Sequence, residues 1–254
     1  MRFDSLLMLL VPLACFTVGC HQSEPEKTTA LTTNKPPASR ATEPDDARDS
    51  NGPLVAISLR GQDMTLADLA NSEDAKSLER INAHSAGLTE ADMAALANFP
   101  NLKKLMMNVN SKITDESLRH LKALEELRIL SLFFCPQLTG SGFEHLTELD
   151  KLANLNIGNN KNITDESLLH LRQLESLQIL LASPLHGITD AGVKHVSEFS
   201  NLRRLRLSGD QITDAGLEHL ASLKNLEVLT LSRSHSEAAI AKLQQALPNC
   251  TIQQ

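Results

Sequence analysis

Apolar residues recur along most of this 254-residue chain in the pattern L-x-x-L-x-L, once every 24 or 25 residues. The copies begin at Leu54, Leu78, Leu102, Leu127, Leu152, Leu177, Leu202 and Leu226. The last two apolar positions of each copy lie two residues apart, so both side chains point to the same face of a short β-strand. The pattern therefore predicts one strand for each copy.

A second phrase, Ile-Thr-Asp or a close variant, follows most of these strands at the same spacing. Clear examples begin at Ile113, Ile163 and Ile188. Thr or Asp can accept hydrogen bonds from the first N–H groups of a helix, and apolar residues three apart then give that helix one buried face. Each unit is thus predicted to be a strand and a helix, and its apolar side becomes buried only when units stack.

This period and motif are typical of a leucine-rich repeat solenoid. The expected fold class is therefore α/β, with a curved parallel β-sheet on the concave face and α-helices on the convex face. Residues 54–254 are predicted to form one domain of about eight repeats with a C-terminal cap. The cap would contain a last amphipathic helix over 236–247.

The repeats resemble the cysteine-containing subclass, in which Cys or Asn follows the strand and a true helix covers the convex side. Eukaryotic members of this subclass often follow an F-box, but no F-box precedes the repeats here. In the subclass, the Cys or Asn side chains form a buried polar ladder. That position holds Asn110, Cys135, Asn160, Leu185 and Asp210. The resemblance implies a ladder that is interrupted at Leu185, and it implies the binding of another protein.

Residues 1–20 are predicted to be an export signal, because an apolar run over 6–18 ends at Gly19-Cys20. A small residue followed by Cys resembles the lipobox of bacterial lipoproteins, which implies lipidation of Cys20. Thr17 stands where such boxes usually have Leu, and Cys15 offers an earlier site. An ordinary cleaved signal peptide therefore stays open as an alternative.

Residues 21–53 contain five prolines and many charges but few large apolar residues, so they cannot form a core. We expect a disordered tether that spans about 30 Å. Together with a lipidated Cys20, it would anchor the repeats to a membrane of the cell envelope, where they would face the periplasm or the cell exterior.

The remaining cysteines, Cys135 and Cys250, fall five repeats apart, which is about 24 Å at the spacing of stacked strands. This separation excludes a disulfide between them and predicts two buried thiols. The formal charge of −7 gives no support for nucleic-acid binding. The chain is expected to be a monomer without a cofactor.

One histidine per repeat could indicate a metal site. These residues are His120, His145, His170, His195 and His219. A repeat copies every position, however, and neighbouring helices lie about 10 Å apart, which is wide for shared ligands. We therefore favour a structural role for the ladder and keep metal binding as an alternative. The chain contains no nucleophile elbow, phosphate loop or H-E-x-x-H motif, so no enzyme activity is expected.

The side chains that flank the buried strand positions should face outward on the concave sheet. Several of these are apolar although they are expected to be exposed, and two neighbours are basic. The predicted partner-binding residues are Met106, Ile129, Phe133, Ile179, Leu181, Arg204 and Arg206. Clustered apolar groups beside charge are typical of a protein-binding surface. Strand propensity alone could also place Ile and Leu there, and the repeats would then be a structural spacer of the envelope.

Overall fold

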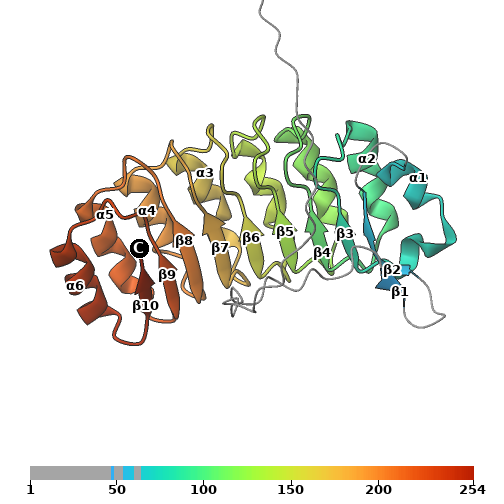
Figure 1. The fold of residues 1–254 in the computed structure, drawn as a ribbon. Helices are drawn as coiled ribbons and strands as arrows, with labels where there is room; N and C mark the ends of the chain where they lie inside the picture. Colours follow the sequence, from blue (N-terminus) through green and yellow to red (C-terminus); the bar gives the residue numbers. More distant parts are fainter. Residues whose placement is uncertain (1–46, 49–53, 60–63) are drawn as a thin grey trace, which may run out of the picture. The chain divides into compact units, whose positions relative to one another are not determined.

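The computed structural model describes residues 47–48, 54–59 and 64–254. Their strands form one ten-stranded sheet in which the order in space follows the order in sequence (Figure 1). The strands are β1 (Ala47–Arg48), β2 (Leu54–Ser58), β3 (Arg80–Asn82), β4 (Lys104–Met106), β5 (Ile129–Ser131), β6 (Asn154–Asn156), β7 (Ile179–Ala182), β8 (Arg204–Leu207), β9 (Val228–Thr230) and β10 (Thr251–Gln253). Strands β2 to β10 are parallel, which confirms the predicted α/β solenoid.

The register of the sheet places equivalent positions of the repeats side by side. Leu105, Leu130, Leu155 and Leu180 are direct partners on β4 to β7, and all four are fully buried. The apolar side chains of successive repeats continue into one core that extends from Leu59 to Cys250. Burial of each Leu contributes about 1.5–3 kcal/mol, so the repeated pattern supplies most of the driving force for stacking.

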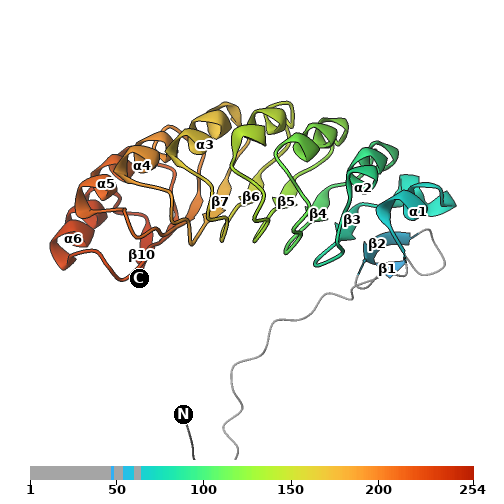
Figure 2. The same ribbon diagram turned by 90° about the horizontal axis from the view of Figure 1, so that it is seen from above.

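The convex side is formed by short helices (Figure 2). The α-helices are α1 (Leu66–Ala70), α2 (Glu90–Ala95), α3 (Asp165–His170), α4 (Asp190–Val196), α5 (Asp214–His219) and α6 (Glu237–Ala246). The 3₁₀ helices are η1 (Glu73–Ser77), η2 (Leu96–Asn98), η3 (Glu116–Ala123), η4 (Ser141–Leu146), η5 (Leu171–Gln173) and η6 (Leu220–Ser222).

In two repeats the convex segment is 3₁₀ throughout, at η3 and η4, where the resemblance implied a true α-helix. A 3₁₀ helix rises about 2.0 Å per residue against 1.5 Å for an α-helix, so it covers the same distance with fewer residues. Other repeats combine the two forms, as α3 and η5 do.

The threonines of the Ile-Thr-Asp phrase cap their own helices, as predicted. Thr89 accepts a hydrogen bond from the backbone N–H of Asp92, and Thr189 and Thr213 cap α4 and α5 in the same manner. These bonds satisfy helix N–H groups that have no partner within the helix.

The aspartates of the phrase, in contrast, bind the next repeat. Asp115 accepts hydrogen bonds from the backbone N–H and the hydroxyl of Thr139, at 3.0 and 2.7 Å. Asp165 binds Thr189 in the same two ways, and Asp190 binds Thr213. The aspartates therefore join neighbouring repeats along the convex side.

Close packing accompanies each of these aspartates. A Cβ atom on Gly142 would lie 2.3 Å from the carbonyl oxygen of Asp115, and one on Gly192 would lie 2.2 Å from Oδ1 of Asp165. At two places where the aspartate is replaced, by Glu90 and by Gly140, a serine of the next repeat stands in place of the glycine. Ser117 donates to Glu90, and Ser167 donates to the carbonyl of Thr139, beside Gly140.

The polar ladder is present over three repeats. The amide of Asn110 donates to the carbonyl oxygens of Ala83 and Met107, and that of Asn160 donates to Leu132 and Ile157. The backbone N–H of Cys135 donates to Oδ1 of Asn160 at 2.6 Å. Leu185 is buried and interrupts the ladder, as expected.

The expected ladder role of Asp210 is wrong. Its side chain is exposed and pairs with His186 at 2.9 Å. The loop after β8 is one residue shorter than its counterparts, so the buried position falls on Gly209 instead.

The predicted signal and lipidation site lie outside the described residues. Most of the expected tether does too, but Ala47–Arg48 form β1, which pairs antiparallel with β2. A strand at this point protects an edge of the sheet that would otherwise be open. Within the described ranges, no helix has both the length and the apolar character needed to span a bilayer.

Candidate functional site

We define the concave surface as the outward-facing side chains of β3 to β10. Six of the seven predicted binding residues lie on it, and Phe133 lies just beyond the end of β5. Within β4 and β6 the central residue is buried and its two neighbours are half-buried, which confirms the alternation. Met106, Ile129, Ile179 and Leu181 are half-buried, and Arg204 and Arg206 are exposed. A half-buried aliphatic side chain in an open sheet leaves apolar area available for contact.

The sheet divides the apolar side chains into two groups. Met106 lies on β4 and Ile129 on β5, whereas Ile179 and Leu181 lie on β7. The intervening β6 presents Asn154 beside Ile129 and Ile179. At about 4.8 Å per strand, the two groups are about 10 Å apart, so one partner segment could contact both.

Phe133 lies two residues after the end of β5 and packs partly on its own sheet. A Cβ atom on Gly158 would lie 3.3 Å from Cδ2 of the Phe133 ring. The backbone N–H of Phe133 donates to Oδ1 of Asn108 at 3.2 Å, and the hydroxyl of Ser131 donates to the same oxygen. The ring is therefore held in place and half-buried before any partner arrives.

Arg204 and Arg206 stand beside the second apolar group. The register pairs Ile179 with Arg204 and Leu181 with Arg206. Neither arginine forms a salt bridge with a residue that the structure describes, although the adjacent Arg203 binds Glu227 through Nε at 2.8 Å. Two guanidinium groups thus remain available for an acidic or polar partner.

The concave surface has a charge opposite in sign to that of the whole chain, whose formal charge is −7. Among the strands β3 to β10, its positions hold Arg80, Lys104, Arg204 and Arg206. None of the outward positions on these strands, or directly after them, holds Asp or Glu. The acidic residues lie elsewhere, so this surface presents a cationic field that would attract an acidic partner.

Sequence reasoning missed Phe134, which is 43% exposed. Its backbone has φ of 55°, in the left-handed region that a bulky residue rarely adopts. The repeat pattern placed Phe133 on the sheet but gave no information on the next residue, which belongs to the turn. The pair of adjacent phenylalanines was the only available indication.

The histidine ladder does not converge on a common point. His120 binds Glu90 through Nε2 at 2.8 Å, whereas Nδ1 of His195 is buried and lies 4.0 Å from Glu198. In the part of the chain that the structure describes, no three His, Cys, Asp or Glu side chains are placed to hold a metal.

The two cysteines of the repeats are buried free thiols. Burial raises the pKa of Cys135 to about 11, although a backbone hydrogen bond acts in the opposite direction. At neutral pH this thiol is protonated, and a protonated thiol is a poor nucleophile. Cys135 therefore acts as a core residue.

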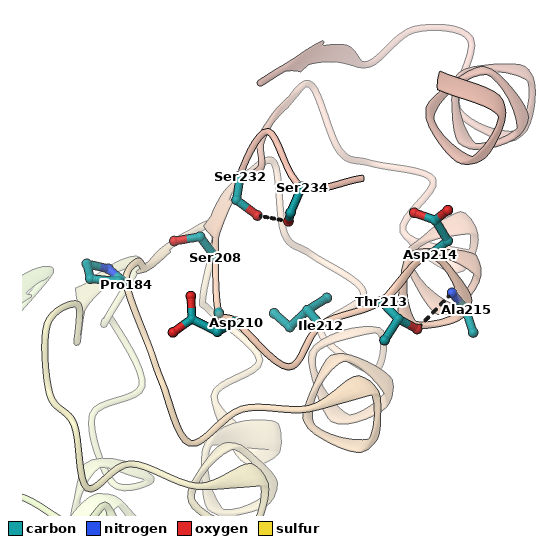
Figure 3. Close-up of a pocket in the computed structure, with 10 residues that line it drawn as sticks. Pro184, Ser208, Asp210, Ile212, Thr213, Asp214, Ala215, Ser232 and Ser234 are labelled. Carbon is teal, nitrogen blue, oxygen red and sulfur yellow. Dashed lines mark hydrogen bonds between the residues drawn. The ribbon is translucent and has the colours of Figure 1, made fainter. Parts of the chain in front are cut away.

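A hollow of about 640 Å³ lies beside the short loop after β8 (Figure 3). Its lining includes Pro184, Ser208, Asp210 and Ser232. The hydroxyl of Ser232 bonds to that of Ser234 at 2.8 Å, and that of Ser208 bonds to Ser183 at 2.6 Å. These hydroxyls bind one another and not a base, so they are not arranged as activated nucleophiles.

No protein-family model matches the chain, and no curated protein is similar to it in sequence. Solved structures do match. Internalin C2 from Listeria monocytogenes is 22% identical, with a TM-score of 0.54 over 78% of this chain and 79% of that one. A chain of the yeast Rad7–Elc1 complex is 16% identical, with a TM-score of 0.59 over 78% of this chain and 56% of that one. The fold is a leucine-rich repeat solenoid.

A further match, to the internalin inlF of Listeria monocytogenes, has 19% identity and a TM-score of 0.47 over 79% of this chain and 67% of that one. At such low sequence identities, the similarity of this chain to these structures concerns the fold alone. Its function has to be argued from the side chains on its concave surface.

Proposed function

We propose that this leucine-rich repeat solenoid is a protein-interaction module whose concave surface binds an acidic protein partner. The observation that carries the proposal is the position of Ile179 and Leu181, half-buried and in register with the exposed Arg204 and Arg206. Apolar area provides the affinity of such a contact, and unpaired arginines provide orientation and attraction.

The distribution of charge supports an acidic partner. The chain has a net charge of −7, so solubility does not require a concave surface without carboxylates. Their absence there is better explained by the attraction of an acidic partner. The matching chain of the yeast Rad7–Elc1 complex is also an example of a protein of this fold bound to another protein.

The proposal extends to the location of the module. We propose that Cys20 is lipidated and that residues 21–53 tether the repeats to a membrane, facing the periplasm or the cell exterior. The support is the apolar run over 6–18, the Gly19-Cys20 junction and the polar, proline-rich sequence that follows.

Substitutions on the concave surface test the binding proposal. The variants Phe133→Ser, Leu181→Ser and Arg206→Glu are each expected to reduce recovery of a crosslinked partner about tenfold, or about 1.4 kcal/mol of binding energy. Matched controls are Arg172→Glu on η5 and Ile240→Ser on α6, both on the convex side. Circular dichroism and thermal melting should show that each variant folds.

Equal recovery from all folded variants and controls would exclude the concave surface as the binding site. That result would favour the alternative, a structural spacer whose surface needs no specific contacts.

The tether is tested separately with Cys20→Ser and, as its matched control, Cys15→Ser. We expect the wild type and Cys15→Ser to carry an acyl mass and to fractionate with membranes. Cys20→Ser should lose both properties. If Cys15→Ser loses them instead, the processed residue is Cys15, and if the wild type carries no acyl mass, the anchor does not exist.

A further inference from the structure

A turn in the left-handed conformation follows the strand in four successive repeats. It contains Ser85, Val109, Phe134 and Asn159, with φ between 54° and 59°. Gly and Asn adopt this conformation most readily, and a bulky or β-branched residue does so at a cost. Asn159 is therefore the residue that fits the turn, and Phe134 is a costly choice.

Burial does not compensate for this cost at Phe134. Its side chain is 43% exposed, whereas Val109 is half-buried at the equivalent position. An exposed aromatic side chain on a strained backbone adds neither stability nor solubility. Such an outlier is grounds for a functional hypothesis, and the position of Phe134 next to the concave surface indicates what that function is.

Phe134 continues the apolar area of Phe133 over the edge of the sheet. The backbone N–H of Phe134 donates to the carbonyl of Gly158, and that of Val109 donates to the carbonyl of Phe133. Phe133 and Phe134, which we call the aromatic edge, therefore lie between the turns of the preceding and following repeats.

Positive charge flanks the aromatic edge. Lys112 lies in the preceding turn and Lys161 in the following one. The bridge between Thr114 and Gln137 places the preceding turn beside that of the aromatic edge, and the contact of Asn162 with the carbonyl of Pro136 does the same for the following turn. Both lysines are exposed and form no salt bridge with a described residue. The edge thus has the same combination as Leu181 and Arg206, with apolar side chains beside available cations.

We infer that the partner is an acidic protein segment that crosses the concave surface and continues over the aromatic edge, where one of its apolar side chains packs on Phe134. This inference rests on the proposed function and adds a second contact region to it. The lysines would pair with carboxylates on either side of that apolar side chain. A membrane is a less suitable occupant, because a bilayer cannot follow the concave surface from Leu181 to Phe134.

Site-specific photocrosslinking in the cells that produce the protein tests this inference on the full chain. The probe is p-benzoylphenylalanine, which replaces Phe134 in one variant and Leu181 in a second. A third variant carries it in place of Lys122, on the convex η3, as the control. We expect positions 134 and 181 to crosslink to the same protein, within a segment that contains Asp or Glu around an apolar residue. Position 122 should give no such product.

The outcomes separate this inference from the proposed function. Products from position 181 without any from 134 would overturn the aromatic edge and leave the concave surface as the site. The absence of products from both would overturn both. Products from 134 that contain only lipid, or a segment without acidic residues, would overturn the inference as well.

A quantitative test follows with a synthetic peptide of the crosslinked segment. Phe134→Asn should weaken its binding at least fivefold and should not lower Tm, because Asn fits the left-handed turn better than Phe. The matched control Val109→Asn, in the equivalent turn, should change the affinity less than twofold. Unchanged binding by Phe134→Asn would overturn the inference.

Discussion

Buried side-chain amides connect the turns of this solenoid. The side chain of Asn160 is fully buried and bonds to three backbone groups, namely the carbonyls of Leu132 and Ile157 and the N–H of Cys135. The carbonyl of Ile157 belongs to the same repeat as Asn160, and the other two groups belong to the preceding repeat. A single amide therefore satisfies polar groups that the stacking of repeats removes from water.

We expect Asn160→Leu to lower the free energy of unfolding by about 2 to 5 kcal/mol, because it leaves three buried backbone groups without partners. Urea unfolding monitored by circular dichroism measures the change. The control is Asn162→Leu, which removes an exposed hydrogen bond to Pro136 and should cost less than about 1 kcal/mol. Similar costs for both substitutions would contradict this account of the ladder.

Asp115, which joins two neighbouring repeats, makes the stability of the protein depend on pH. Burial acts to raise the pKa of Asp115, but hydrogen bonds from Thr139, Gly142 and Gly140 outweigh it and hold the pKa below the usual 3.8. A carboxyl with a lowered pKa in the folded state stabilises the fold above its unfolded pKa. This contribution disappears as the pH falls through the folded pKa.

The Asp115→Asn variant should therefore be less stable than the wild type at pH 6, by about 1 to 3 kcal/mol, and the difference should shrink toward pH 2. Urea midpoints at intervals between these pH values would show it. Glu125→Gln, at an exposed position, serves as the control. A difference that stays constant over the whole range would show that the charge of Asp115 is not involved.

At the scale of elements, the strands were predictable and the form of the helices was not. Leu at fixed spacing determines which side chains are buried, and the register of β3 to β9 follows from that alone. The 3₁₀ helix η4, for example, begins after Gly140, which makes close contacts with Ser167 of the following repeat. A pattern read within one repeat contains no information on these contacts.

Gly140 allows a direct test of such a contact. Its φ is +91°, and a Cβ atom would lie 2.3 Å from Cβ of Ser167. Gly87 also has a positive φ, of +64°, but nothing lies within 4 Å of the added atom. We expect Gly87→Ala to cost about 1–2 kcal/mol of stability from backbone strain, and Gly140→Ala to cost about 1–3 kcal/mol more from the collision.

Thermal and urea unfolding of both variants provide the comparison. The double variant Gly140→Ala/Ser167→Gly should recover part of the loss, because it removes the atoms that collide. Equal costs for the two alanine substitutions would show that η4 has room to move.

At the scale of the whole repeat region, each unit contacts chiefly its neighbours. The core passes through all of them, but the sheet and the Asp–Thr bonds connect only adjacent repeats. Stability in such a structure is a sum of units and of interfaces between them. A defect should therefore have different effects at the centre and at the end.

Hydrogen exchange would detect this difference. Leu243→Ala in α6 should increase exchange only in the last repeats, whereas Leu130→Ala in β5 should increase it in the repeats on both sides. Each substitution removes a buried side chain and should cost about 2–5 kcal/mol. An increase along the entire sheet after Leu243→Ala would show that the region unfolds as one unit.

The candidate site was predictable only in outline. Alternation along the strands placed Ile179, Leu181 and the two arginines on one face, because that face is determined by the period of two. The absence of carboxylates from the concave surface follows from the same alternation, applied to every strand. The exposure of Phe134 could not be predicted, since it depends on a turn conformation that the repeat pattern leaves open.

The pairing between Asp and Gly restricts how this gene could have been assembled by duplication. A unit with Asp, as at Asp165, must be followed by one with Gly at the position of Gly192, and the unit with Ser167 must be preceded by one with Gly at the position of Gly140. Copies of one 25-residue segment are consequently not freely interchangeable. A recombinant that exchanged the units of Asp165 and Gly140 would keep every leucine and would still place side chains where no space exists. The sequence of each repeat therefore restricts which repeats can stand next to it in the chain.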